Sequence, residues 1–161
     1  MGPFKLADTL QISKREAEDL IEKYFTEFPN IRDFLQELGT FGTRNGYICT
    51  FKPFKRRRWF DTWFPKIWND RSKLQEFGSI ERASKNTPIQ GSSADMTKLA
   101  LIYIHREIEE SWSDSVKIVM TVHDQIDTIC KEEVADAWSI KMTELMEKAA
   151  KIIIPNGLLK A

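Results

Sequence analysis

The sequence predicts an α+β fold in which helices pack on a small antiparallel sheet. Residues 13–28 and 74–110 space their apolar side chains at the interval expected of amphipathic helices. Between residues 117 and 130, two short apolar segments flank a polar turn, which is typical of a β-hairpin. A further amphipathic segment over 132–150 predicts the last helix of the chain.

The first predicted helix begins at Ser13, which forms the pattern of a capping box with Glu16. Its apolar stripe consists of Ala17, Leu20, Ile21, Tyr24, Phe25 and Phe28. Pro29 interrupts this helix because proline cannot donate a backbone hydrogen bond within a helix. A second helix follows over 31–38. The glycines that are expected to loosen and end this second helix are Gly39, Gly42 and Gly46.

A short β-hairpin is predicted next, with strands over 47–51 and 56–59 joined by a turn at 52–55. An aromatic stretch follows over 59–65, and Trp68 lies close behind it. Aromatic rings interleaved with arginine and lysine stack on nucleic-acid bases or on each other. A hydrophobic cluster beneath a long loop is therefore an interpretation that the sequence supports equally well.

The formal net charge of the 161 residues is zero, but the charges are unevenly distributed. Residues 52–73 carry a net charge of +6, whereas residues 107–147 carry −8. A basic stripe within a neutral protein favours contact with a polyanion at one place, and a solvated basic loop is the alternative. The candidates for this contact are Arg56, Arg57 and Arg58.

The composition disfavours several other classes of protein. A hydrophobic fraction of 42% and a charged fraction of 30% are ordinary for a soluble globular domain. No apolar run approaches the roughly 20 residues that cross a bilayer, and the first residues lack a signal-peptide pattern, so we expect a cytoplasmic protein without a membrane or secretion signal. Cys49 and Cys130 have no partner at metal-ligand spacing, which disfavours a zinc site.

Polar side chains recur at intervals of four residues within the predicted helix over 74–110. They are Arg82, Asn86 and Gln90. Residues four apart share one helical face, so this row suits a ligand that repeats along a line, such as a minor groove with acceptors at every base pair. A polar face in contact with solvent is the alternative. Pro88 is expected to kink or divide the helix, with an interruption over 88–91.

A polar turn, His123-Asp124-Gln125, separates predicted strands over 117–122 and 126–130, of which the first reads as a buried strand. A carboxylate held at a tight turn between strands has a well-defined position, which suits Mg²⁺ because this ion requires oxygen ligands in near-octahedral geometry. Asp124 is thus a candidate metal ligand, and His123 a candidate contact to a phosphate or sugar. An aspartate that only forms the turn is the alternative.

Taken together and in order, these motifs resemble those of the family A, DNA polymerase I-like DNA polymerases. Residues 81–95 resemble the hallmark stretch of that family, residues 122–124 its motif C, and residues 1–7 the end of its motif B. Further family-like landmarks are Leu10-Gln11-Ile12-Ser13, Glu16-Ala17, Tyr24-Phe25, Phe28-Pro29 and Gly46-Tyr47. The resemblance covers essentially the whole chain and implies the C-terminal portion of such a polymerase.

The resemblance implies part of the fingers and palm of a right-hand polymerase. Residues 1–75 would hold the fingers-end helices and the basic hairpin, and residues 76–161 a palm portion with motif C. Primer–template DNA and dNTPs are the implied partners, in a bacterial or phage-infected cell. Asp124 would coordinate Mg²⁺ in a two-ion site, with His123 beside the primer terminus. The implied DNA contacts are Arg82, Asn86, Gln90 and Gln125.

The sequence departs from the family pattern in several ways. The motif A aspartate and the fingers Lys, Arg and Tyr would lie upstream of Met1, and the family's C-terminal strand would lie beyond Ala161. Gln125 stands where the family usually has Glu, which replaces a carboxylate with a neutral amide. The tryptophan-containing region 52–73 also differs from the common pattern.

We therefore expect this chain to be inactive alone and to need an upstream polymerase fragment that carries motif A and the fingers helix. A non-catalytic DNA-binding fragment is the second hypothesis, because Gln125 removes a carboxylate while the basic stripe is retained. A purely structural helical protein, which would explain the aromatic stripes, is the third.

Overall fold

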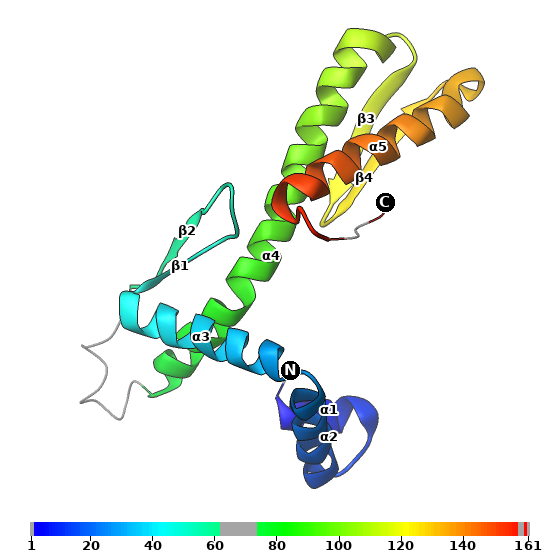
Figure 1. Ribbon diagram of the computed structural model, residues 1–161. Coiled ribbons are helices and arrows are strands. Elements are labelled where there is room, and N and C mark those ends of the chain that lie inside the picture. Colours follow the sequence, from blue (N-terminus) through cyan, green and yellow to red (C-terminus); the bar gives the residue numbers. More distant parts are fainter. Residues whose placement is uncertain (1, 62–73, 158–159, 161) are drawn as a thin grey trace.

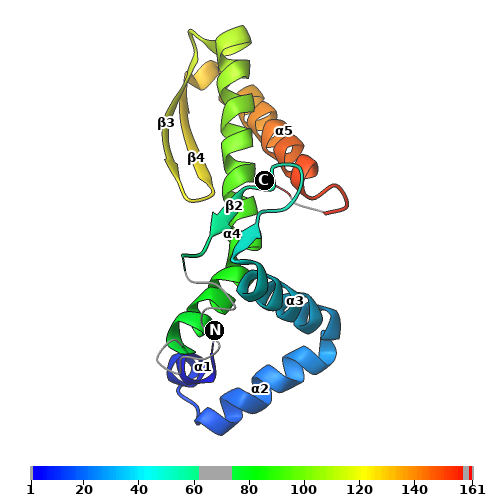
Figure 2. The same cartoon turned by 90° about the vertical axis from the view of Figure 1, so that its left-hand side faces the viewer.

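The computed structural model describes residues 2–61, 74–157 and 160, and it confirms the α+β class. The elements in chain order are α1 (Pro3–Leu10), α2 (Lys14–Glu27), α3 (Pro29–Asn45), β1 (Tyr47–Cys49), β2 (Arg57–Trp59), α4 (Leu74–Glu107), the π-helical turn η2 (Ile108–Trp112), β3 (Val116–Val122), β4 (Gln125–Cys130), the 3-10 turn η3 (Glu132–Val134) and α5 (Ala135–Ile153). Figure 1 shows α4 running through the middle of an elongated molecule. The helix α3 crosses its first half, and α5 and the β3–β4 hairpin lie along its second half (Figure 2).

In the N-terminal region, the predicted capping box is confirmed, and one further helix is present. The backbone N–H of Ser13 donates to Glu16 Oε2 at 2.9 Å, and the N–H of Glu16 donates to Ser13 Oγ at 3.2 Å, so the capping box is present. The backbone N–H of Ser13, and after it the Ser13 side chain, hold the pKa of the Glu16 carboxyl below its ordinary value. The helix α1 was not predicted; it begins with Pro3 in the first helical turn, where proline is well tolerated.

The glycines of α3 do not loosen the helix, so that prediction is wrong for Gly39 and Gly42 and correct only for Gly46. The helix runs unbroken to Asn45, and Gly46 then adopts a left-handed φ of 73° at its C-cap. A Cβ at Gly42 would lie 1.8 Å from Ser84 Oγ of α4, so this glycine is what allows the two helices to approach closely. Tertiary packing therefore explains why a glycine occurs inside this helix, although glycine has a low helix propensity.

The predicted interruption of α4 at residues 88–91 is also wrong, because the helix is continuous with Pro88 inside it. The residues of α4 that face α3 and the β1–β2 hairpin recur every four positions and are buried, namely Ile80, Ser84, Pro88 and Ser92. The missing N–H of Pro88 removes one helical hydrogen bond. Burial of this face against α3 and β1 outweighs the loss, since most helical stability in proteins comes from packing.

The main core lies where α4, α5 and the β3–β4 hairpin meet. Its buried residues are Ala100, Ile104, Ile108, Val116, Ile126, Trp138, Leu145 and Ala149. Trp138 Nε1 donates to Thr128 Oγ1 at 2.8 Å, which satisfies the polar end of a buried indole. The hairpin itself was predicted correctly, with Val116 paired to Cys130 and Val122 paired to Gln125.

The predicted burial of the strand over 117–122 is wrong, because Ile118 is only half-buried and the other residues of this range are exposed. Met120 and Ile129 lie on the outer face and are 51% and 62% exposed, whereas Val116 and Ile126 lie against α4 and α5. The hairpin is thus covered by helices on one side only, as in many antiparallel sheets. Within residues 2–61 and 74–157, no helix is both long enough and apolar enough to cross a membrane.

Replacing Gly42 with alanine tests the close helix crossing. Gly42→Ala is expected to lower the free energy of unfolding by about 1–3 kcal/mol, because a new Cβ forces α3 away from Ser84. Gly78→Ala is the matched control, since its Cβ would meet only the end of the Arg82 side chain at 3.3 Å. The control should be neutral or stabilising by up to about 1 kcal/mol in urea unfolding. Equal effects of the two substitutions would contradict the role of Gly42.

Candidate functional site

The β3–β4 hairpin turns tightly at His123 and Asp124. Val122 pairs with Gln125, so only two residues form the turn. His123 has a φ of 55°, and two-residue hairpin turns of this kind require a positive φ because it matches the twist of the strands. Both side chains are exposed at the tip. The pairing of the two strands therefore fixes the backbone of the turn that carries Asp124.

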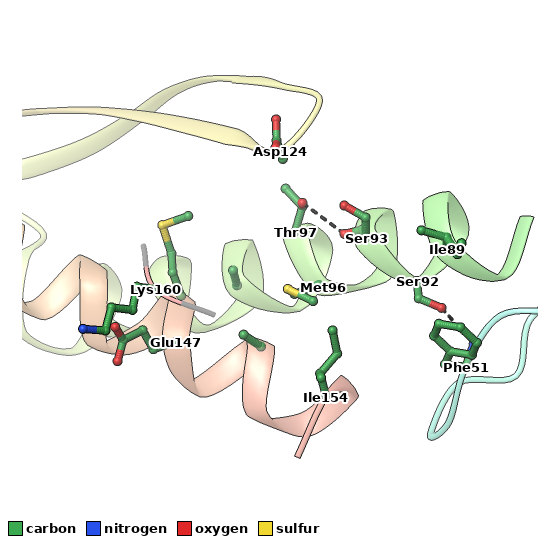
Figure 3. A pocket seen from close by; sticks show the side chains of 13 residues that line it. Phe51, Ile89, Ser92, Ser93, Met96, Thr97, Asp124, Glu147, Ile154 and Lys160 are labelled. Carbon is green, nitrogen blue, oxygen red and sulfur yellow. Dashed lines mark hydrogen bonds between the residues drawn. The ribbon is translucent and has the colours of Figure 1, made fainter. Parts of the chain in front are cut away.

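Asp124 lines a cleft of about 390 Å³ between the hairpin tip, α4 and α5. Figure 3 shows Asp124 above Ser93 and Thr97 of α4, with Glu147 of α5 further along the cleft. The remaining lining residues are Phe51, Ile89, Ser92, Met96, Ala100, Met146, Ala150, Ile154 and Lys160. The sequence analysis missed Glu147, whose helical pattern gave no signal beyond its place in an amphipathic helix.

The carboxylate of Asp124 offers hard oxygen donors, which is the ligand chemistry that Mg²⁺ prefers. Gln125 cannot add charge there, and its Nε2 donates to Asp127 Oδ1 at 2.6 Å on the same strand. Among the described residues, no three His, Cys, Asp or Glu side chains gather closely enough to hold a metal ion. Asp124 therefore remains a candidate ligand by its chemistry alone.

The predicted polar row lies on the exposed side of α4. Arg82, Asn86 and Gln90 are all exposed, whereas Ser84 and Pro88 face α3 and the β1–β2 hairpin. Because residues three and four apart share a helical face, the side that carries Asn86 and Gln90 continues toward Ser93 and Thr97. Those two residues line the cleft with Asp124. The helix thus joins the polar row to the cleft below the hairpin tip.

Hydrogen bonds hold the β1–β2 hairpin against the same helix. Arg56 Nε donates to Asp95 Oδ1 at 2.7 Å, and Arg58 Nη1 donates to Thr87 Oγ1 at 3.3 Å. The N–H of Phe51 also donates to Ser92 Oγ at 2.8 Å. Two of the three predicted DNA-contacting arginines therefore reach α4 itself.

Arg57 points the other way, since successive side chains of a strand alternate between faces. Its guanidinium lies over the rings of Tyr47 and Trp59. Trp63, Phe64 and Trp68 of the predicted aromatic stretch lie outside the described residues. For Trp59, the structure shows stacking within the hairpin on an exposed surface.

Asp95 is a buried carboxylate that the sequence analysis did not identify. It is only 7% exposed, and its Oδ2 has no hydrogen-bond partner among the described residues. An aspartate in the interior of a helix, away from either cap, is a signal that could have revealed a buried partner. The Arg56 ion pair supplies that partner, because an unpaired buried charge is strongly unfavourable.

The profile that describes DNA polymerase family A matches residues 1–157. The chain is similar to DNA polymerase I of Caldicellulosiruptor bescii, at 32% identity over 96% of the chain and 17% of that protein. It is 36% identical to DNA polymerase I of Rhizobium leguminosarum over 78% of the chain and 12% of that protein. A solved structure, the POL domain of Pol1 from M. smegmatis in complex with DNA primer-template and dNTP, matches with a TM-score of 0.77 and 32% identity over 92% of this chain and 24% of that one.

Removing Arg56 tests the ion pair with Asp95. Arg56→Ala is expected to lower the free energy of unfolding by about 1–2 kcal/mol, less than for a fully buried pair because the Arg56 side chain is 55% exposed. Arg32→Ala is the control, since its ion pair with Glu22 is exposed on both sides and should contribute less than about 1 kcal/mol. Urea unfolding measures both values. A smaller loss for Arg56→Ala than for Arg32→Ala would contradict the proposed anchoring.

Proposed function

Because the chain belongs to DNA polymerase family A, we propose that it forms the C-terminal part of a DNA-directed DNA polymerase, which transfers nucleotides from dNTPs to a primer 3′ end. The observation that carries this proposal is Asp124, which lies at a tight hairpin tip above a cleft. The helix α4, which lines this cleft, also carries an exposed row of hydrogen-bonding side chains. A polymerase needs both features side by side, because the reacting end of the primer must be held where the metal ligand lies.

We assign residues 1–75 to the end of the fingers with the basic hairpin, and residues 76–161 to a palm portion. The helix α4, described from Leu74 to Glu107, extends across this boundary. The same helix contacts α3 through its first half and α5 through its second half, so it would connect the two portions rigidly. Such a connection would keep the hairpin arginines at a constant position relative to Asp124.

In this proposal, the exposed row on α4 contacts the primer–template duplex. Arg82, Asn86 and Gln90 donate hydrogen bonds to minor-groove acceptors or to the backbone, which occur at every base pair irrespective of sequence. His123, adjacent to Asp124 at the tip, contacts the sugar or phosphate at the primer terminus. Gln125 contributes a hydrogen bond without charge. Arg57 and Arg58 add sequence-independent attraction to phosphates, which weakens as salt is raised.

The proposed cofactor is Mg²⁺, with Asp124 as the ligand that this chain supplies. When bound in a two-ion site, the metal activates the primer 3′-hydroxyl and neutralises the charge that develops on the leaving pyrophosphate. Asp124 would present its carboxylate at the tip for that purpose, because Val122 and Gln125, which flank the two-residue turn, are paired in the sheet. A second carboxylate is needed from elsewhere in the polymerase.

We propose that activity requires an upstream polymerase fragment that carries motif A and the fingers helix. The chain spans 17% of the length of relatives such as the C. bescii enzyme, and 24% of the M. smegmatis POL-domain chain. That mycobacterial structure contains primer-template DNA and dNTP, which motivates the same partners here.

A non-catalytic DNA-binding fragment is the second candidate function. Gln125, engaged with Asp127, replaces the acid expected beside the metal ligand, whereas the arginines of the hairpin are retained. This candidate expects salt-dependent binding to primed DNA that does not respond to Asp124→Asn. Metal-dependent affinity that Asp124→Asn removes would favour the polymerase instead.

Primer extension tests the proposed reaction. The chain alone should not extend a primed template with Mg²⁺ and all four dNTPs, whereas a mixture with an upstream polymerase fragment should. Asp124→Asn should reduce extension by the mixture at least a hundredfold, because the amide removes a charged metal ligand. Asp114→Asn, an exposed acid distant in sequence from the turn, is the control. Robust extension by the chain alone would refute the need for a partner.

Salt dependence of DNA binding tests the polar row. Arg82→Ala should weaken binding to primed DNA regardless of sequence and make the slope of log affinity against log salt shallower by about one. Arg15→Ala, on the exposed surface of α2, is the matched control and should leave the slope unchanged. Fluorescence anisotropy over a salt series measures both. An unchanged slope for Arg82→Ala would remove this arginine from the proposed interface.

A further inference from the structure

The outer face of the β1–β2 hairpin carries a stack of two aromatic rings and an arginine. Tyr47 and Trp59 pair directly across the strands, with ring centroids 5.1 Å apart. Arg57 Cζ lies 5.0 Å from the centroid of Tyr47 and 5.6 Å from that of Trp59, within the range of cation–π contact. Phe41 of α3 meets Tyr47 edge-on at 5.4 Å and supports the stack from behind. We call Tyr47, Arg57 and Trp59 the aromatic platform.

The aromatic platform is not part of a core. Trp59 is 63% exposed, and an indole with that much free surface is available to a ligand. The opposite face of the hairpin provides the packing, since Ile48 is only 3% exposed and Arg58 reaches Thr87 of α4. The alternation of the two strands therefore separates a structural face from an open aromatic face.

The charge around the aromatic platform favours an anionic ligand with flat faces. Residues 47–59 contain five basic side chains and no acidic one. Arg57 places one of these charges directly beside the rings. Aromatic rings interleaved with basic residues bind single-stranded nucleic acid, because bases stack on the rings while the cations attract the phosphates. Duplex DNA offers no such open base face along its length.

We propose that the aromatic platform binds an unpaired base of single-stranded DNA by stacking on Trp59, with Arg57 beside the neighbouring phosphate. The proposal rests on the proposed polymerase function, because the unpaired bases of a primer–template belong to the template overhang. The position of the hairpin agrees with it, since Arg58 of the same strand contacts Thr87, next to Asn86 in the polar row. The platform would hold the template strand where it is single-stranded, while α4 contacts the duplex.

Base-dependent binding distinguishes this proposal from a stack that only stabilises the hairpin. Fluorescence anisotropy would compare three primed DNAs, which carry no overhang, a natural template overhang or an abasic overhang of equal length. The natural overhang should bind about tenfold more tightly than the abasic one, which is the order of one base–aromatic stack. Both overhangs carry the same phosphates, so electrostatic attraction cannot produce the difference.

Substitutions test whether Trp59 causes the preference for the natural overhang. Trp59→Ala should abolish the preference for the natural overhang, and Trp59→Phe should retain most of it because a ring remains. Phe4→Ala is the matched control, since Phe4 is 73% exposed beneath Lys14 Nζ at 4.7 Å but lies on α1. The control should keep the preference. A preference that survives Trp59→Ala would overturn the assignment to the aromatic platform.

Binding by the wild-type chain tests whether the protein recognises the bases of the overhang, even if the Trp59 variants do not fold. Equal binding of natural and abasic overhangs, with primed duplex still bound, would overturn the platform and leave the proposed polymerase function intact. Absence of binding to all three DNAs, even at low salt, would overturn both proposals.

Discussion

The close approach of α3 and the β1–β2 hairpin to α4 is the constraint on which the rest of this structure depends. Gly42 of α3 and Gly91 of α4 stand where a Cβ would overlap Ser84 Oγ at 1.8 Å and Thr50 Cγ2 at 2.6 Å. Their missing side chains let the side chains of Ser84 and Thr50 pack directly against the glycine backbone, and interior packing at such density leaves little freedom for movement. The long helix thereby becomes a rigid axis from which both the arginines and the cleft are positioned.

Polar contacts then determine how the hairpin sits on that axis. The Arg56–Asp95 ion pair and the hydrogen bond from Arg58 to Thr87 connect one face of β2 to α4. Alternation along the strand leaves Arg57 on the other face with Tyr47 and Trp59. Adjacent residues of this segment therefore have two roles, since Arg56 and Arg58 anchor the hairpin to α4 while Arg57 lies with the aromatic rings on the other face.

At the other end of α4, the core beneath the β3–β4 hairpin fixes the tip that carries Asp124. Helices cover one face of this hairpin, and Met120 and Ile129 remain exposed on the other. Large exposed apolar side chains on a sheet are typical of a surface that another part of a protein covers. This agrees with a chain that matches less than a quarter of the length of its solved relative, at 24%.

The sequence by itself determined the α+β class, the capping box at Ser13, the hairpin around Asp124 and the family, because these depend on local pattern and motif order. It also placed Arg82, Asn86 and Gln90 on one helical face, since helical period alone decides that. Only the tertiary structure decided the continuity of α3 and α4 and the roles of Gly42, Pro88 and Asp95. Local propensity reads a glycine or proline as a break, whereas contacts between residues more than 35 positions apart in the chain decide whether the helix continues there.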